Sequence, residues 1–204
     1  MRLFLNATSP FARVARVAAL EKGCAHQLEL IDSDPWNSDS RLLAAHPQLR
    51  VPVLITPEGH AISESLLIAQ YLDSVGTGAA LVPAAQAAQV LAATSVAYGL
   101  MESAFGQVIA RRHGGAAADE TVLGQRRLAA IARALQWLEA ALPDAVPAQG
   151  PMTLALITAA VALEYVCFRL PALLPEAQFP QLHAWLAQAL QRPSLAQTRF
   201  IAVV

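Results

Sequence analysis

Charged residues are scarce in this sequence. They make up 14% of the 204 residues, where about 25% is usual, so much of the surface must be hidden in a core, an interface or a membrane. The most apolar stretch covers residues 152–163 and is stopped by Glu164 and Arg169, which is short of the ~20 residues that a membrane span needs. We therefore expect a buried core helix there, and no membrane partner.

Cysteine is also scarce, and no long apolar run opens the chain. Cys24 and Cys167 are the only cysteines and lie outside any Cys-x-x-Cys pair, which argues against a disulfide framework and a dithiol redox centre. The apolar run that follows Met1 and Arg2 ends at Asn6 and is shorter than the core of a secretory signal. Both observations favour a cytoplasmic protein with structural thiols.

An excess of charge of one sign is missing as well. The formal net charge is −1 and no basic run occurs, whereas nucleic-acid binding needs clustered Lys and Arg. The densest basic patch, Arg111, Arg112 and His113, is typical of a helix end that complements the helix dipole. We therefore expect no nucleic-acid partner.

Patterns for metal and nucleotide binding are absent from the sequence. No glycine-rich phosphate loop is present, and the histidines lack metal-ligand spacing. The histidines are His26, His46, His60, His113 and His183. We expect neither a metal nor a nucleotide cofactor.

The first third of the chain alternates strand and helix patterns. Ser9 and Pro10 suit the start of a helix that ends near Gly23, and the turn residues at 57–60 predict a hairpin. We expect strands at residues 3–5, 28–31, 53–55 and 61–62, a short helical turn at 41–45 and a helix at 64–75. The expected order is strand, helix, strand, helix, hairpin, helix.

Glycine and proline mark the end of this first segment. After Gly76, Gly78 and Pro83, strand patterns nearly vanish and alanine-rich helical patterns follow. We expect helices at residues 84–112, 119–141, 152–168 and 179–190, with a proline-containing loop at 143–151. The sequence thus predicts an α/β domain at 1–76, a linker at 77–84 and an all-α domain at 85–204.

Ser9 lies at the expected junction between the first strand and the first helix, where Pro10 and Phe11 follow it. A helix N-terminus exposes unpaired N–H groups and partial positive charge, which suits an anion such as a thiolate. The alternative is that Ser9 only caps the helix.

Two further stretches carry ligand-binding chemistry. Pro52 directly precedes an expected strand, a position that proline tolerates. A cis bond there would turn the Val51 backbone toward a peptide ligand, although only ~5% of X–Pro bonds are cis. Ser65 can donate to a carboxylate and Glu64 can accept from an ammonium group, as the two ends of an amino acid require. The alternative for that pair is a helix cap with an acidic first turn.

Together, the opening at 9–13, the step at 51–54 and the pair at 64–65 resemble the glutathione-binding domain of the glutathione S-transferase superfamily. The resemblance extends over the whole chain, because that family continues with an all-helical domain. It implies the cytosolic GST fold, a thioredoxin-like α/β N-terminal domain followed by an all-α helical-bundle C-terminal domain. It also implies glutathione as co-substrate and a homodimer that pairs the first domain of one subunit with the second of the other.

The resemblance assigns roles around the thiol of glutathione. Ser9 is the thiol contact and the catalytic group, and Phe11 packs near the thiol. Val51 precedes a cis Pro52 and pairs its backbone with the cysteinyl unit. Arg50 stands near the glycine carboxylate.

The resemblance also assigns the remaining subsites. Glu64 and Ser65 hold the γ-glutamyl end of glutathione. The first long helix borders the electrophile pocket, although packing in the core or a dimer explains its apolar stripe equally well. The pocket residues expected from that stripe are Tyr98, Met101, Glu102 and Phe105.

Two positions depart from the family pattern. Redox-active relatives have Cys where this chain has Ser9, so turnover through a mixed disulfide is not expected here. The family usually has Asp where this chain has Leu156, in a capping box with Ser or Thr, and Thr153 must cap that helix alone.

The resemblance implies an enzyme that uses the glutathione thiolate to attack a small hydrophobic electrophile. One alternative is a non-catalytic interaction or stress-adaptor protein with the same fold. Another is a glutathione-dependent peroxidase, isomerase or lyase that uses the same site.

Overall fold

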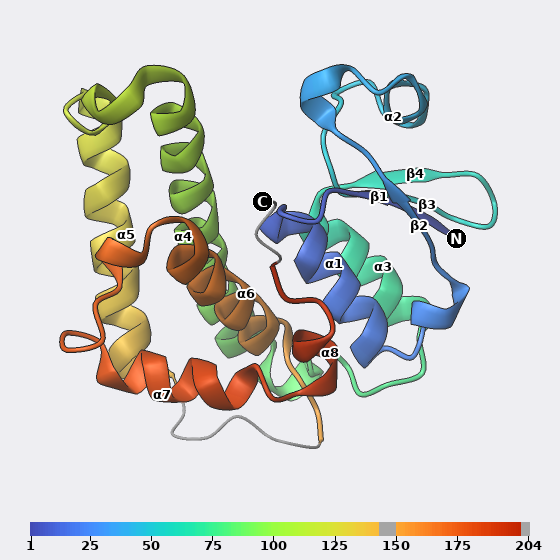
Figure 1. Cartoon of the computed structure of the whole chain (residues 1–204). Helices are drawn as coiled ribbons and strands as arrows, with labels where there is room; N and C mark the ends of the chain where they lie inside the picture. Colours follow the sequence, from blue (N-terminus) through green and yellow to red (C-terminus); the bar gives the residue numbers. More distant parts are fainter. Residues whose placement is uncertain (143–149, 201–204) are drawn as a thin grey trace.

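A small mixed sheet forms the N-terminal part of the chain, which we define as residues 1–75 (Figure 1). Its four strands are β1 (Arg2–Leu5), β2 (Glu29–Asp32), β3 (Val53–Ile55) and β4 (Ala61–Ser63). The strand order is β2-β1-β3-β4, in which β1 and β2 are parallel and the other neighbours are antiparallel. The strands expected from the sequence are confirmed, with ends that shift by one residue.

Helices cover both faces of this sheet. The helices are α1 (Pro10–Glu21), α2 (Ser40–Ala45) and α3 (Ser65–Val75). Successive side chains of a strand point to opposite faces, so Leu3 joins the large core beneath α1 and α3, whereas Phe4 joins a smaller cluster with Leu42 of α2. Accordingly, α1 and α3 lie together on one side of the sheet and α2 on the other (Figure 1).

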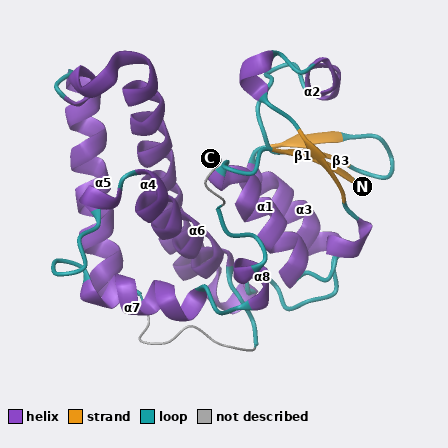
Figure 2. Cartoon of the chain, in the orientation of Figure 1, coloured by secondary structure: helices purple, strands orange, loops and turns teal. Residues whose placement is uncertain are grey.

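The computed structural model describes residues 1–142 and 150–200, so most of the loop expected at 143–151 lies outside the described residues. In the described residues after 75, regular structure is helical and no strand occurs (Figure 2). The helices are α4 (Ala87–Gly114), α5 (Val122–Ala141), α6 (Leu154–Arg169), α7 (Pro180–Ala189) and α8 (Pro193–Ala196). Short 3₁₀ turns are η1 (Ala25–Gln27), η2 (Pro35–Asn37), η3 (Ala84–Gln86), η4 (Gly115–Asp119) and η5 (Pro171–Leu173).

The helix α6 lies at the centre of this helical part, between α4 and α1 (Figure 1). Its residues 157–166 are all buried, which confirms the core helix expected from the apolar stretch. The Thr153 side chain accepts a hydrogen bond from the Leu156 amide at 3.4 Å, so Thr153 caps α6 without the family's usual Asp. None of the helices in residues 1–142 and 150–200 combines the length and apolarity needed to cross a membrane.

Two helices start three residues later than the sequence indicates, and in α4 the first three residues form η3 instead. We expected a helix from residue 119, but α5 begins at Val122 because the Thr121 side chain accepts from the Gly124 amide at 2.9 Å. Asp119 instead ends η4 and accepts from Arg111, with 2.7 Å between Arg111 Nη2 and Asp119 Oδ2. A capping side chain therefore decides the boundary.

The N-terminal and helical parts share one apolar core, which runs from Leu3 through Val17 of α1 to Val161 of α6. A buried salt bridge also joins the N-terminal and helical parts. Arg13, which is 2% exposed, forms a salt bridge with Glu164 and donates to the Leu195 carbonyl at 3.2 Å. The arginine of the 9–13 stretch thus joins the two parts and does not line the pocket described below.

The C-terminal end of α1 is also held by charged groups. Glu21 accepts two hydrogen bonds from Arg192, at 2.7 and 2.6 Å. Lys22, the next residue, pairs with Asp73 of α3 at 2.9 Å and donates to the Gly78 carbonyl at 2.6 Å. These contacts fix α1 relative to both α3 and α8, and so fix the position of its N-terminus at the pocket.

Candidate functional site

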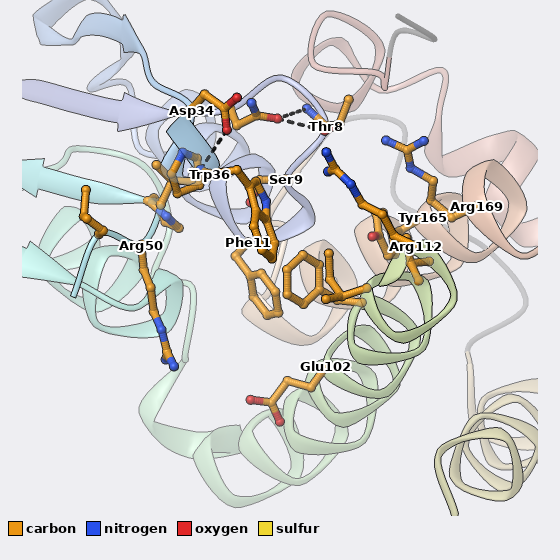
Figure 3. A pocket seen from close by; sticks show the side chains of 18 of the residues that line it. Thr8, Ser9, Phe11, Asp34, Trp36, Arg50, Glu102, Arg112, Tyr165 and Arg169 are labelled. Carbon is orange, nitrogen blue, oxygen red and sulfur yellow. Dashed lines mark hydrogen bonds between the residues drawn. The ribbon is translucent and has the colours of Figure 1, made fainter. Parts of the chain in front are cut away.

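A cavity of about 930 Å³ lies between the N-terminal part and the helices α4 and α6. Its N-terminal wall comes from the start of α1, from η2, from the segment before β3 and from Glu64. Its opposite wall comes from one face of α4 and from the end of α6, and Figure 3 shows both walls. Most of the residues that the sequence nominated meet in this one cavity.

Ser9 lies on the wall where β1 leads into α1. Its side-chain oxygen accepts from the Ala12 amide at 3.2 Å, which makes it the N-cap of α1. A hydroxyl can accept and donate at once, and among the described residues the Ser9 hydroxyl donates to none. Capping and thiol contact are therefore compatible roles.

Thr8, the residue before Ser9, has both of its donors in use. The Thr8 hydroxyl donates to Asn6 Oδ1 at 2.8 Å, and the Thr8 amide donates to the same oxygen at 3.0 Å. Asn6 and Thr8 both line the cavity, but the hydroxyl and the amide of Thr8 already donate to Asn6. Ser9 is the hydroxyl on this wall whose proton has no acceptor in the described residues.

The segment before β3 forms the next part of the wall, with Arg50, Val51 and Pro52 all in contact with the cavity. The Val51–Pro52 peptide bond is cis, as predicted. No backbone or side-chain partner for the Val51 amide or carbonyl occurs in residues 1–142 and 150–200. The Val51 backbone is thus open to a ligand.

The start of α3 lacks a side-chain cap. Glu64 is its N-cap residue, with φ 68 and ψ 120, and its side chain makes no capping hydrogen bond. A positive φ is unfavourable for residues other than glycine, and such strained backbone often occurs at functional sites. The first amides of an uncapped helix suit a carboxylate. The carboxylate of Glu64 lies 3.8 Å from Arg50, and both side chains are exposed.

Ser65 is placed differently from the expectation. It is fully buried and does not line the cavity, and its hydroxyl donates to the Tyr98 hydroxyl at 3.3 Å. Burial raises the pKa of Tyr98, while the Ser65 hydrogen bond acts in the opposite direction. Tyr98 therefore stays protonated at neutral pH and links α4 to the start of α3.

An aromatic cluster forms the apolar part of the cavity. Phe11 packs edge to face on Tyr98 at 5.6 Å and on Phe105 at 5.5 Å between ring centroids. Tyr98, Glu102 and Phe105, which the sequence predicted for the electrophile pocket, lie on one face of α4 and line the cavity. Met101 was assigned wrongly to this face. It is fully buried in the core, because one residue in a helix turns the side chain by about 100°.

Several residues that line the cavity were not predicted from the sequence, among them Trp36, Arg112, Tyr165 and Arg169. Arg112 had been read only as part of a basic helix end, yet its guanidinium carbon lies 5.5 Å from the Trp36 ring. Arg169 in the sequence indicates only the stop of an apolar stretch. Tyr165 carries no signal in the sequence, since it lies between Glu164 and Arg169 just after that stretch.

No group of three or more His, Cys, Asp or Glu side chains that could hold a metal ion occurs in residues 1–142 and 150–200. Cys24 and Cys167 are both free thiols. Burial raises the pKa of each of them.

The fold and the position of the cavity are those of a thioredoxin-like domain joined to an all-α domain. The model of the "Glutathione S-transferase, N-terminal domain" family matches residues 8–75. The chain is 33% identical over 174 residues to the uncharacterized GST-like protein YibF of Escherichia coli K12, covering 83% of each chain. The chain belongs to the glutathione S-transferase superfamily.

Two solved structures from Pseudomonas fluorescens Pf-5 extend this similarity over the whole fold. A glutathione transferase family member with bound glutathione is 29% identical, with a TM-score of 0.87 over 98% of this chain and 99% of that one. A second structure, with bound S-(propanoic acid)-glutathione, is 28% identical, with a TM-score of 0.83 over 99% of this chain and 100% of that one.

Proposed function

We propose that the protein is a glutathione transferase. It binds glutathione along the N-terminal wall of the cavity, ionises the thiol beside Ser9, and directs the thiolate to a small hydrophobic electrophile against the aromatic cluster. The observation that carries this proposal is the Ser9 hydroxyl, which caps α1 with its oxygen and keeps its proton free on the cavity wall. The glutathione bound in the similar Pseudomonas structure supports it.

Each part of glutathione has a matching group on this wall. The uncapped start of α3 provides partial positive charge for the γ-glutamyl carboxylate, and Glu64 accepts from the ammonium group of the same unit. The cysteinyl unit pairs with the open backbone of Val51. Arg50 is exposed beside Glu64 and supplies a positive charge for the glycine carboxylate.

The energy needed to ionise the thiol is within reach of Ser9 and α1. Lowering a thiol pKa from ~8.5 by two units requires about 2.7 kcal/mol of preference for the thiolate. A hydroxyl hydrogen bond to a charged acceptor contributes roughly 1.5–3 kcal/mol, and a helix N-terminus adds about 0.3–1 kcal/mol. No general base is required.

Replacing the hydroxyl tests this function. Ser9→Ala is expected to raise the pKa of the bound thiol by about one to two units and to leave most of the glutathione affinity, which rests on Val51, Glu64 and the start of α3. The measurements are thiolate absorbance of bound glutathione against pH, and calorimetry for affinity.

Two further variants separate the hydroxyl from the cap. Ser9→Gly removes the hydroxyl but costs only a few tenths of a kcal/mol as an N-cap, so it should behave like Ser9→Ala. Ser9→Thr keeps the hydroxyl and should preserve a low thiol pKa. A thiol pKa that is unchanged in both Ser9→Ala and Ser9→Gly would mean that Ser9 only caps the helix.

We also propose that the protein is a cytoplasmic homodimer. The low charged fraction supports a large interface, and Leu67 of α3 and Leu91 of α4 are 54% and 51% exposed in the single chain. Such an interface should bury more than ~1,000 Å². A clean monomer at micromolar concentration in sedimentation would contradict the dimer.

A further inference from the structure

The charged side chains that line the cavity are separated between its two ends. Glu102 and Arg50, with its neighbour Glu64, lie toward one end, whereas Arg112 and Arg169 lie toward the other, beside Thr8 (Figure 3). The transferase site as proposed uses the first end and leaves the two arginines without a role.

The arginine end has little negative charge to offset it. Neither Arg112 nor Arg169 forms a salt bridge with any carboxylate in residues 1–142 and 150–200. Asp34 is the acidic residue on that side of the cavity, but its oxygens accept from the Trp36 amide at 2.9 Å and from Asn37 Nδ2 at 2.7 Å. The end is therefore net positive and faces the space in front of Ser9.

Both guanidinium groups are held by aromatic rings. The Arg112 guanidinium carbon lies 5.5 Å from the Trp36 centroid, and that of Arg169 lies 4.2 Å from the Phe168 centroid. Such a contact uses the flat face of the guanidinium and leaves its in-plane N–H groups able to donate. Both arginines can therefore donate to a planar anion at the same end of the cavity.

Tyr165 adds a neutral donor at the same end. It lines the cavity and is 2% exposed. Burial raises the pKa of Tyr165 to about 12, against the opposite effect of Arg169. The hydroxyl is therefore protonated at neutral pH and can donate to an anion without adding charge.

We propose that the electrophile of the transferase reaction inferred above carries a carboxylate, and that Arg112 and Arg169 bind it. The apolar body of this substrate lies against Phe11 and Phe105, and its carboxylate points to the arginine end. With a chloronitrobenzoate, the thiolate sulfur forms a bond to the ring carbon as the C–Cl bond breaks, and chloride leaves with the electron pair.

The test compares two glutathione conjugates that differ only in charge. S-(4-carboxy-2-nitrophenyl)glutathione carries the carboxylate, and S-(4-carbamoyl-2-nitrophenyl)glutathione has a neutral amide of nearly the same shape. Calorimetry should show tighter binding of the carboxylate conjugate to the wild-type protein, by about tenfold or more. The preference should decline with added salt, because both arginines are exposed to solvent.

Variants of the two arginines test whether they cause the preference for the carboxylate conjugate. Arg112→Gln and Arg169→Gln should each weaken binding of the carboxylate conjugate about tenfold and leave the carboxamide conjugate within about twofold. The matched control is Arg111→Gln, which removes a charge from the same turn of α4 but is paired with Asp119 and lies outside the cavity. It should leave the preference unchanged.

The outcomes separate this inference from the function on which it rests. If glutathione itself binds poorly, the transferase function fails. Free 4-chloro-3-nitrobenzoate against 4-chloro-3-nitrobenzamide then tests the arginine pair without the tripeptide. Equal affinity for the charged and neutral compounds, or a preference that survives the double substitution Arg112→Gln with Arg169→Gln, overturns the carboxylate site.

Discussion

Charged side chains are arranged differently in two regions of this protein: the contact of α1 with the helical part, and the cavity. In the first region the buried charges have close partners, as with Arg13 and Glu164 or Glu21 and Arg192. In the cavity, Arg112 and Arg169 are exposed and rest on aromatic rings, with no salt bridge in the described residues.

The difference follows from the cost of removing charge from water. A buried ion must be paired when the chain folds, because an unpaired one costs several kcal/mol. An exposed ion remains hydrated, needs no partner within the chain, and is available to bind a ligand. The paired charges should therefore determine stability, and the unpaired charges of the cavity should determine what binds.

The largest expected effect is at the buried pair. Glu164→Gln removes the counter-charge of Arg13, which is 2% exposed, and should lower the free energy of unfolding by about 3–5 kcal/mol. Burial lowers the pKa of Arg13 and Glu164 acts to raise it, which agrees with a charge that depends on its partner. Urea denaturation followed by circular dichroism measures the change.

A double replacement serves as the control for this pair. Arg13→Met combined with Glu164→Met removes both charges and keeps apolar volume, so it should cost less than Glu164→Gln alone. A loss below about 1 kcal/mol for the single variant would show that the buried pair does not hold α1 in place.

A smaller effect is expected at Glu21, and it depends on pH. Burial alone would raise the pKa of this carboxyl, but hydrogen bonds from Arg192 and Ser194 outweigh burial and lower it below the ordinary value of 4.5. A lowered folded-state pKa gives stability that is present above the unfolded pKa and is lost as pH falls through the folded pKa.

Glu21→Gln should therefore destabilise the protein by about 1.5–3 kcal/mol at pH 7. The gap to the wild type should close as the pH falls below 4.5. Urea denaturation at several pH values between 7 and 3 measures this gap. The exposed Glu29 offers a matched control, since Glu29→Gln should show little difference at any pH. A gap of constant size for Glu21→Gln would contradict the assigned role.

The smallest effect on stability is expected in the cavity. Arg112→Gln and Arg169→Gln should each change the free energy of unfolding by less than about 1 kcal/mol, the size of an exposed contact between an arginine and an aromatic ring. Thermal and urea denaturation check this. A loss of unfolding free energy above ~2 kcal/mol would mean that these arginines stabilise the fold as the paired charges of α1 do. The two regions would then not differ in the way described.

Local signals in the sequence account for much of what was predicted correctly. Ser9 followed by Pro10 marks a helix start because a hydroxyl cap and a proline both suit that place, and α1 begins there. Thr153 caps α6 for the same reason. The cis bond at Pro52 was predicted from the family resemblance and not from local chemistry, since most X–Pro bonds are trans.

Errors arose where the direction of a side chain had to be known. Met101 and Glu102 are neighbours in α4, yet Met101 is buried in the core and Glu102 lines the cavity. Alanine-rich α4 has apolar residues on most sides, so its periodicity does not show which face meets α6 and which meets α1. Ser65 was placed correctly at the start of α3, but its contact with Tyr98 joins residues 33 positions apart.

The sequence by itself determined the order of the strands and longer helices, the caps at Ser9 and Thr153 and the family, because these depend on neighbouring residues and on short motifs. Only the tertiary structure brought Arg112 of α4 and Arg169 of α6 to one end of the cavity that contains Ser9. It also decided that Arg13 joins the two parts of the chain while Arg112 faces the open cavity. Residue type is the same in both cases, and burial and available partners, which depend on packing between distant segments, give each arginine its role.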